Sequence, residues 1–378
     1  MGFTFQFILK LFATMFLSII LTPLLKLLSF KIGAVDRPGE RRINEKTMPT
    51  AGGLSIFISF VVAIVWEFND MLDAKQIWPM LIAAFIIILT GLADDIFEIT
   101  PMQKTLGIIV ASLVIYFIGD ITIDTISIPF LGSFQLGWLS LPMTLIWILA
   151  ITNAVNLIDG LDGLACGVAV IALVTIGLIS YFFLPTNGVP LAIMIFSLVA
   201  AIAGFFPYNF HPATVFLGDT GALFLGFMIS VFSLQGLKNA TFISVLTPMF
   251  ILGVPITDTV YAMLRRYFNK KPISSADKMH LHHRLLSLGF THRGAVLTIY
   301  ALAMVFALIA LLMNYASTWA IILLVISTLF GLELFIELIG LVGENRQPLM
   351  HTLKFVGNRR HRQQILNKTK HKNKHEKK

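Results

Sequence analysis

Long runs of apolar residues, separated by short polar loops, repeat along most of the chain. Most of these runs reach the ~17–25 residues that a helix needs to cross the hydrocarbon core of a bilayer. The pattern therefore predicts an all-α integral membrane protein. We expect about eleven spanning helices, at 3–28, 50–68, 77–93, 104–119, 139–158, 164–184, 189–207, 221–236, 242–264, 294–313 and 317–342.

The first run and the segment between the fourth and fifth runs need a separate interpretation. A cleaved signal peptide is the alternative for the first run, but Lys10 falls inside it and no small-residue cleavage site follows. Segment 120–138 instead alternates Ile and Thr around a Pro-Phe-Leu-Gly turn. That alternation predicts a short β-hairpin, and the order of the spans places it outside the cell.

The composition excludes several classes of protein. Of the 378 residues, 57% are hydrophobic and only 13% are charged, whereas soluble domains carry ~25% charged residues. A soluble enzyme and a disordered protein are therefore excluded. The single Cys166 allows no intramolecular disulfide, so a secreted disulfide scaffold is excluded as well.

The net charge of +8 comes from one end of the chain. Residues 343–378 contain eleven Lys and Arg and two Glu, whereas residues 1–342 carry a net charge of −1. We therefore divide the chain into a transmembrane domain, 1–342, and a basic tail, 343–378, which we expect to be largely disordered. A basic tail of this kind holds anionic lipid or marks topology, so we expect no nucleic-acid partner.

Loop charge also predicts the orientation. With the N-terminus outside, the cytoplasmic loops and the tail hold 24 of the 28 Lys and Arg, and the opposite loops hold only Lys75 and Lys238. Positive residues concentrate on the cytoplasmic side of membrane proteins. The odd number of spans then puts the C-terminus in the cytoplasm.

Polar residues that could act in catalysis or binding collect at the cytoplasmic helix ends. Asp94 and Asp95 close the third run, and Lys104 opens the fourth. Adjacent carboxylates point ~100° apart on a helix, so we expect them to play different roles. Their mutual repulsion favours a division into a metal ligand and a base, and a solvated acidic helix end is the alternative.

The next polar cluster follows the fifth run. Its two amides and two acids are spaced by three residues, which predicts a slanting ladder on one side of a helix: Asn153, Asn156, Asp159 and Asp162. Gly160 and Gly163 predict that the helix loosens there. Oxygen ligands of this kind suit Mg²⁺ and a nucleotide better than zinc.

A third cluster precedes the eighth run, from Asn209 and His211 to Asp219 and Thr220. Asp219 or Thr220 is placed to cap that helix, whose free N–H groups would attract phosphate. Asp219 is also a natural carboxylate ligand for Mg²⁺. Residues 49–53 offer a second helix N-terminus with a glycine-rich approach.

A histidine cluster lies in the largest basic loop. It consists of His280, His282, His283 and Arg284. With no cysteine near and with basic neighbours that repel a dication, imidazoles and a guanidinium fit a diphosphate clamp better than a zinc site. Glu333 and Glu337 in the last run are expected to be structural.

These motifs resemble a known family. GLADD, NAVNLIDGLDGLA, NFHPATVFLGDTGA and HLHHRL occur in the order typical of the polyprenyl-phosphate N-acetylhexosamine-1-phosphate transferases. The resemblance covers about residues 1–342. The HLHHR sequence is similar to the UDP-GlcNAc branch, because the phospho-MurNAc-pentapeptide translocases typically carry three consecutive histidines followed by Phe.

The resemblance implies transfer of GlcNAc-1-phosphate from UDP-GlcNAc to undecaprenyl phosphate, with release of UMP, at the cytoplasmic face of a bacterial plasma membrane. It implies Mg²⁺ as cofactor, with Mn²⁺ as a substitute, and a homodimer. Asp94 and Asp95 match the family's catalytic acids, and Asn156 and Asp219 match its metal ligands. The substrate-contacting positions of the family match Lys104, Asp159, Asp162, Asn209, His280, His282, His283 and Arg284.

Several alternatives stay open at this point. The translocase of peptidoglycan synthesis is the nearest alternative, although Glu98 stands where that branch has Lys. A secondary transporter would place its polar site near the bilayer midplane, whereas these acids crowd one face. A lipid-binding scaffold or flippase would not need the Asn, Asp and His set. The downstream product, such as teichoic acid, is not written in the sequence.

Overall fold

The computed structural model describes residues 5–38, 46–68, 71–128, 132–184, 188–235, 240–268, 270, 279–341 and 348–357. This part of the chain is mostly helical and forms two compact units. The first unit comprises Met1–Thr259 and Thr291–Ser317, and the second comprises Val260–Phe290 and Thr318–Lys378. Arg41, Arg42 and the tail beyond residue 357 lie outside the described residues.

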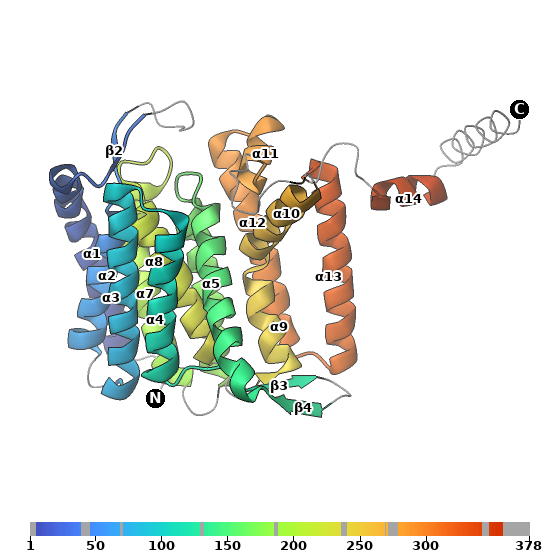
Figure 1. The fold of residues 1–378 in the computed structure, drawn as a ribbon, viewed down its shortest axis with the longest axis horizontal. Helices are drawn as coiled ribbons and strands as arrows, with labels where there is room; N and C mark the ends of the chain where they lie inside the picture. The colour runs from blue at the N-terminus through green and yellow to red at the C-terminus, as the bar shows by residue number, and fades with distance from the viewer. Residues whose placement is uncertain are drawn as a thin grey trace, which may run out of the picture. The chain divides into compact units, whose positions relative to one another are not determined.

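Helices that run alongside one another build the first unit (Figure 1). They are α1 Phe5–Ile32, α2 Gly52–Val62 with the π-helical turn η1 Ala63–Glu67, α3 Ala74–Phe97, α4 Pro101–Phe117, α5 Ser140–Ile158 after the 3₁₀ turn η2 Gly137–Leu139, α6 Leu164–Phe183, α7 Gly188–Asn209, α8 Gly218–Gln235, α9 Phe242–Ile251 and α12 His292–Met313.

Eight helices of the described chain are long and apolar enough to cross a membrane: α1, α3, α5 with η2, α6, α7, α8, α12 and α13. The α2–η1 segment and α4 are shorter apolar helices. A mostly helical protein with several candidate spans agrees with the sequence prediction at this level. The count of eleven and the orientation of the termini stay predictions.

The centre of the first unit is α8. It packs against α2, α3, α5, α6 and α7, and its residues Thr220–Leu234 are buried. Among the eight candidate spans it is the least apolar and the most buried. Because protein surrounds it, α8 does not need the continuous apolar surface that lipid demands of an outer helix.

The run 242–264 was predicted as one continuous helix, and that prediction is wrong. The structure divides it into α9 and α10, Gly253–Phe268, with Leu252 between them. Pro255 explains the break, because proline lacks an N–H and clashes with the carbonyl four residues earlier, but fits the first turn of a new helix.

Short strands complete the first unit. β1 (Val35–Asp36) pairs antiparallel with β2 (Met48–Pro49), directly before α2. β3 (Thr125–Ile128) and β4 (Gly132–Gln135) pair antiparallel within the segment predicted as a hairpin. A third strand, β5 (Ala240–Thr241), pairs parallel with β3, which the sequence analysis did not foresee.

The second unit contains the end of α10, α11 (Leu281–Ser287), α13 (Thr318–Ile339) and α14 (Pro348–Gly357). Glu337 of α13 is buried, and its carboxylate accepts hydrogen bonds from the backbone N–H groups of Leu349 (2.8 Å) and Met350 (2.6 Å). It therefore caps α14. Tyr261 of α10 donates to Glu333. Both glutamates thus make the structural contacts that the sequence analysis expected.

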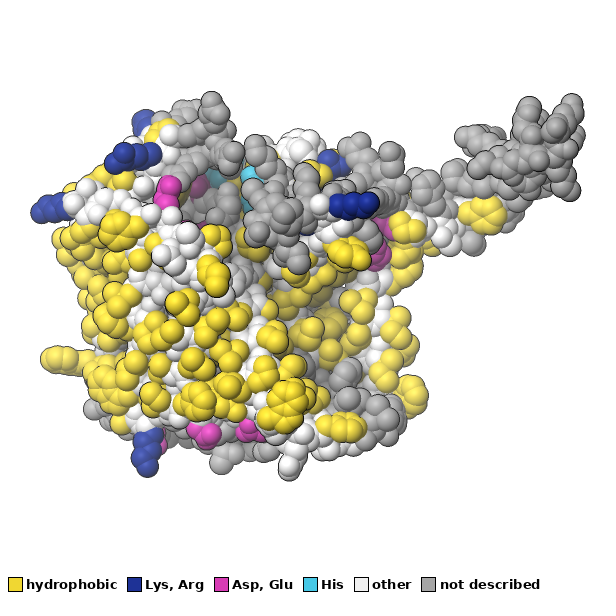
Figure 2. Space-filling model, in the orientation of Figure 1, with side chains coloured by type: hydrophobic (Ala, Val, Ile, Leu, Met, Phe, Trp, Pro, Cys, Tyr) yellow, Lys and Arg dark blue, Asp and Glu magenta, His cyan; other side chains and the backbone are white. Residues whose placement is uncertain are grey.

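Hydrophobic side chains cover the visible face of α1–α5, and charged side chains gather near the ends of these helices (Figure 2). Exposed apolar residues of these helices include Phe12, Phe16, Phe85 and Leu106. An apolar surface of this kind is what lipid contact requires. The candidate site lies at helix ends within this same unit.

Candidate active site

The turn between α3 and α4 brings the first acids opposite a lysine. Glu98 ends α3 in the left-handed conformation, with φ 47°. Thr100 and Gln103 form a capping box at the start of α4, and Pro101 occupies its first turn. These signals start α4 three residues before the predicted boundary, so Lys104 lies in its first turn and faces back toward α3.

Lys104 joins two acids that are far apart in sequence. Its Nζ lies 2.5 Å from the Asp94 carboxylate and 2.9 Å from Oδ1 of Asp219. The Asp94 and Asp219 carboxyl groups lie within hydrogen-bonding reach of each other. Asn156 of α5 donates through Nδ2 to the same Asp219 oxygen, at 2.5 Å. We call these four residues the acid–lysine cluster.

Asp95 does something different from Asp94. Its carboxylate accepts hydrogen bonds from the backbone N–H groups of Asp219 (2.9 Å) and Thr220 (3.0 Å) and from the Thr220 hydroxyl (2.5 Å). The cap of α8 therefore comes from α3, and the prediction that Asp219 or Thr220 caps this helix was wrong. A side chain from a neighbouring helix supplies the acceptor that these N–H groups need.

Gly91 allows the close approach behind this cap. A Cβ at this position would lie 2.4 Å from the Cα of Thr220, which no side chain tolerates. α3 and the start of α8 therefore meet backbone to backbone. This contact brings Asp94 and Asp95 to the first turn of α8.

The start of α2 is closed to a ligand. The N–H groups of Gly52 and Gly53 donate to the backbone carbonyls of Phe216 and Leu217, at 3.2 and 3.1 Å. The sequence predicted residues 49–53 as a second helix N-terminus with a glycine-rich approach. The structure uses these donors instead to hold the loop before α8 in place.

The predicted polar ladder does not continue along one helix. α5 ends at Ile158, so Asp159 lies at its C-cap and Asp162 lies in the following loop. Asn153 bonds within its own helix, to the Leu149 carbonyl. Asn156 is therefore the member of the ladder that belongs to the acid–lysine cluster.

The Asp159 carboxyl group lies close to several other carboxylates. Partial burial, followed by the carboxylates of Asp219, Asp95 and Asp162, raises the pKa of Asp159 to about 8. A carboxyl group is destabilised in its charged form when it loses water and meets like charges. The described contacts provide Lys104 as a cation for this group of acids.

This donor set fits a divalent cation of the Mg²⁺ type. Carboxylate and amide oxygens are the ligands that Mg²⁺ prefers, and an excess of acids over cations leaves charge for it to neutralise. Asp219 presents a carboxylate to the site. Asn156 now donates through its nitrogen, so its amide must turn to offer an oxygen to a metal.

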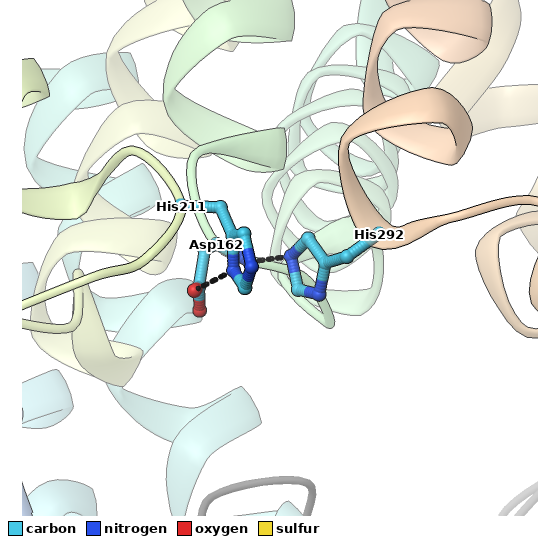
Figure 3. A group of neighbouring side chains, drawn as sticks. All are labelled: Asp162, His211 and His292. Carbon is cyan, nitrogen blue, oxygen red and sulfur yellow. Dashed lines mark hydrogen bonds and ion pairs between the residues drawn. The ribbon is translucent and has the colours of Figure 1, made fainter.

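Asp162, His211 and His292 form a second group of neighbouring side chains (Figure 3). Asp162 accepts from the Ala213 N–H (3.1 Å) and contacts Nδ1 of His211 at 2.8 Å. Its own N–H donates to Nε2 of His292, at 3.1 Å. The His211 and His292 rings stack, with centroids 4.1 Å apart and planes 18° apart.

Asn209 supports the same loop from α7. Its Oδ1 accepts from the Gly163 N–H, and its Nδ2 donates to the Val215 carbonyl, both at 3.2 Å. The side chain is buried. Asn209 thus joins the loop after α5 to the loop before α8, which agrees with a position in the site but makes it a structural link.

The predicted histidine cluster lies in the second unit, where it forms the short helix α11 with His280 as its N-cap. His280 and His282 are buried and their rings are parallel, with centroids 6.0 Å apart. His283 is half-buried. Arg284 donates through Nε to the Ile339 carbonyl of α13, at 2.6 Å, so its guanidinium has a structural contact there.

Sequence reasoning missed His292 as a member of the site. His292 lies 130 positions after Asp162, in a segment without a recognisable motif. Only its place at the start of α12, after a Thr291 cap, gives a local signal. His211 lies inside a motif that the sequence analysis noted, but its pairing with Asp162 required the fold.

Comparison with known proteins adds independent information. Residues 77–237 match the family model described as Glycosyl transferase family 4. This interval contains the whole acid–lysine cluster, together with Asp95, Asp159, Asp162 and Asn209. His292 and α11 lie outside it.

Relatives cover most of the chain. A Bacillus subtilis (strain 168) protein, described as a probable undecaprenyl-phosphate N-acetylglucosaminyl 1-phosphate transferase, is 42% identical over 87% of this chain and 91% of its own length. A decaprenyl-phosphate N-acetylglucosaminephosphotransferase of Mycolicibacterium smegmatis is 33% identical over 73% of this chain and 74% of its own length. An undecaprenyl-phosphate alpha-N-acetylglucosaminyl 1-phosphate transferase of Escherichia coli (strain K12) is 30% identical, over 76% and 78%. The chain therefore belongs to glycosyl transferase family 4, in the branch that contains these relatives.

Proposed function

We propose that this protein transfers GlcNAc-1-phosphate from UDP-GlcNAc to undecaprenyl phosphate and releases UMP. The observation that carries the proposal is the acid–lysine cluster. It places a lysine ammonium, two carboxylates and an amide at adjoining helix ends of a helical membrane protein. Three relatives at 30–42% identity are named as polyprenyl-phosphate GlcNAc-1-phosphate transferases.

Phosphoryl transfer needs positioning and charge neutralisation more than covalent chemistry. In the proposed step, an oxygen of the lipid phosphate attacks the phosphorus that carries GlcNAc, and the bond from that phosphorus to the UMP oxygen breaks. Lys104 would bind a phosphate oxygen when it releases one of its acids. A two-step route through an aspartyl intermediate is the alternative, and trapping a phosphorylated Asp94 or Asp95 with donor alone would establish it.

The contacts favour Asp94 over Asp95 as the acid that meets substrate. Both oxygens of Asp95 are occupied by donors at the start of α8. Asp94 instead faces Lys104 and Asp219. We propose that Asp94 orients the acceptor phosphate or takes its proton, and that Asp95 holds α8 in place.

Mg²⁺ is the proposed cofactor, with Asp219 and Asn156 as its protein ligands and Mn²⁺ as a substitute. When bound, such an ion supplies positive charge to diphosphate oxygens. Asp159, Asp162 and Asn209 would then border the part of the site that holds the nucleotide. His280, His282 and His283 of the second unit stay proposed phosphate contacts, whereas the bond from Arg284 Nε to the Ile339 carbonyl favours a structural role for Arg284.

The acceptor is a membrane lipid, so the reaction must take place where its phosphate leaves the bilayer. We propose eleven spans, an external N-terminus and hairpin, a cytoplasmic C-terminus and a reaction centre at the cytoplasmic face of a bacterial plasma membrane. The asymmetry of Lys and Arg among the loops supports this orientation. A homodimer is part of the same proposal.

The product would start a cell-wall or surface polysaccharide such as teichoic acid. The names of the relatives favour GlcNAc as the sugar over the MurNAc-pentapeptide of the translocase alternative. The clustering of acids at helix ends disfavours a secondary transporter, whose site lies at the bilayer midplane.

The test uses membranes with the full chain, UDP-GlcNAc, undecaprenyl phosphate and Mg²⁺, and measures UMP. We expect UMP release that requires both substrates and falls on chelation of Mg²⁺. Asp219→Ala should lower the rate by roughly 10²–10³-fold, as loss of a group that stabilises charge in the transition state does.

Three results would contradict the proposal. These are no UMP from the wild-type chain with both substrates present, equal activity in Asp219→Ala, and a faster reaction with UDP-MurNAc-pentapeptide. The last result would favour the translocase alternative.

A further inference from the structure

The N-terminal part of α12 contacts both loops that border the acids of the first unit. We infer that this part of α12 is a positioning element for the donor side of the site, in which His292 and Tyr300 hold the loop 159–163. The inference rests on the proposed function for its substrates. Neither residue lies in the motifs that carry the family resemblance, or in the interval matched by the family model.

His292 holds the loop through its backbone. The N–H of Asp162 donates to Nε2 of His292, at 3.1 Å. Because Nε2 accepts this bond, the imidazole must be neutral and carry its proton on Nδ1. His292 follows the Thr291 cap, whose hydroxyl accepts from the Gly294 N–H, so the start of α12 is itself well defined.

Tyr300 holds the next part of the loop, two turns further along α12. Its hydroxyl donates to the Gly163 carbonyl at 2.5 Å. Its ring lies against α6 at Gly167, where a Cβ would come within 2.1 Å of the ring. The absence of a side chain at Gly167 therefore lets Tyr300 reach Gly163, so two bonds from one helix hold consecutive residues of the loop.

The loop 159–163 in turn holds the loop that precedes α8. The Asp162 carboxylate accepts from the Ala213 N–H and contacts His211, and Arg293 of α12 donates to the His211 carbonyl at 3.0 Å. The chain continues from Ala213 to Gly218 and Asp219. The spacing between Asp159 on one loop and Asp219 after the other thus depends on α12.

Asp162, His211 and His292 also have the composition of a transition-metal site, and one ligand atom from each lies within 4.8 Å of the others. The geometry argues against that use. Nε2 of His292 is engaged by the Asp162 N–H, and the two imidazoles stack 18° from parallel. In-plane lone pairs of stacked rings do not converge on one ion, so the group fits a hydrogen-bonded clasp (Figure 3).

A positioning role predicts a specific kinetic pattern. The held loop carries Asp159 and Asp162, which we propose border the nucleotide, whereas Asp94 and Lys104 come from α3 and α4. Loosening the loop should therefore weaken the donor more than the lipid acceptor. Loss of an outer partner that orients a metal ligand typically lowers affinity or activity about 10–100-fold, and we expect an effect near the lower end of that range here.

The experiment compares three variants with the wild-type chain in the UMP assay, varying each substrate in turn. His292→Ala removes the acceptor, whereas His292→Gln keeps one, because an amide oxygen takes nearly the place of Nε2. Tyr300→Phe removes the second bond. Thr298→Ala is the matched control, since Thr298 lies on α12 and its hydroxyl donates to the Gly294 carbonyl within the same helix.

We expect His292→Ala to raise KM for UDP-GlcNAc about tenfold, to leave KM for undecaprenyl phosphate within about twofold, and to be largely rescued in His292→Gln. Tyr300→Phe should shift the same constant in the same direction by a smaller factor. Thr298→Ala should resemble the wild type. Equal changes in both KM values, or no change in His292→Ala, would overturn the inference.

Hydrogen–deuterium exchange separates this inference from the proposed function. Peptides that contain Asp162 and Gly163 should exchange faster in His292→Ala than in Thr298→Ala, whether or not UMP is formed. If exchange is unchanged, α12 does not hold the loop and the inference fails. If the wild-type chain forms no UMP from UDP-GlcNAc, the proposed function fails, while the exchange result still decides the positioning role. A gain in thermal stability with Zn²⁺ alone, lost in His292→Gln, would favour a metal site instead.

Discussion

The acid–lysine cluster and the histidine helix α11 look equally functional in sequence, but their contacts differ. In the cluster, Lys104 bridges the side chains of Asp94 and Asp219. In α11, Arg284 donates to a backbone carbonyl at the end of α13, and His280 and His282 are buried. We propose that the first set of contacts exchanges for a substrate phosphate, whereas the second holds a helix end in place.

The difference has a physical cause. The last carbonyls of a helix have no partner within the helix and need a donor from elsewhere. In the second unit Arg284 donates to the carbonyl of Ile339, the last residue of α13, at 2.6 Å. Arg265 donates to the carbonyl of Leu341, two residues beyond the helix, at 3.0 Å. An arginine within a basic motif is therefore not necessarily available to an anion. The following experiments challenge this contrast, from the largest expected effect to the smallest.

The largest expected difference is between Asp94 and Asp95, in how their substitution affects activity and stability. We expect Asp94→Asn to lower the rate of UMP release by roughly 10²–10³-fold with little change in thermal stability, because it removes charge from the cluster. Asp95→Asn should instead lower the stability by about 1–2 kcal/mol, since it weakens the cap of α8. Activity at several temperatures and the apparent melting temperature in detergent measure both effects.

If Asp95→Asn keeps the wild-type melting temperature while Asp94→Asn loses it, the assignment of the two roles is reversed. The isosteric change keeps the size of each side chain, so each variant serves as the control for the other.

Arg284 tests the second region. Arg284→Ala should lower the apparent melting temperature by about 2–4 °C for each ~1 kcal/mol lost with the Ile339 contact. The rate of UMP release should fall less than about tenfold, in contrast with a residue that contacts the transferred phosphate. Ser287→Ala is the control, because Ser287 lies on the same helix and its exposed hydroxyl donates to a carbonyl within α11. A large rise in KM for UDP-GlcNAc with an unchanged melting temperature would instead make Arg284 a direct phosphate ligand.

The raised pKa of Asp159 predicts how the stability of the protein depends on pH. Its pKa of about 8 lies far above the ordinary value of 3.8, so between these values the folded protein keeps a proton that the unfolded chain has lost. Stability must then fall as the pH rises through this window. Without divalent cations, we expect the wild-type melting temperature to fall more than that of Asp159→Asn between about pH 5 and about pH 9, by about 2–4 °C for each ~1 kcal/mol of this effect. Parallel curves for the two proteins would show that the site does not raise this pKa.

The basic tail should matter least. Truncation after residue 358 should leave UMP release within about twofold of the wild type, because a cluster of Lys and Arg contributes lipid attraction and topology rather than chemistry. Membrane fractions from cells that express each form give both the activity and the amount inserted. Complete loss of activity with normal insertion would assign the tail a direct role.

Much of the fold and part of the site could be predicted before the structure. Apolar runs mark helices wherever their length matches a span, and α5, α6 and α12 end within two residues of the prediction. The errors fall where short-range signals compete. Pro255 divides the run 242–264, and the capping box at Thr100 and Gln103 starts α4 early.

The sequence by itself determined which residue types stand at the helix ends, because hydrophobic period and cap chemistry are local properties. Only the tertiary structure decided their partners. Asp95 became the cap of α8, and Asp94 the partner of Lys104, because Gly91 lets two helices meet. His292 reaches Asp162 across 130 positions through the packing of α12 on α6. Such contacts depend on how distant helices pack, and neighbouring residues along the chain carry no record of it.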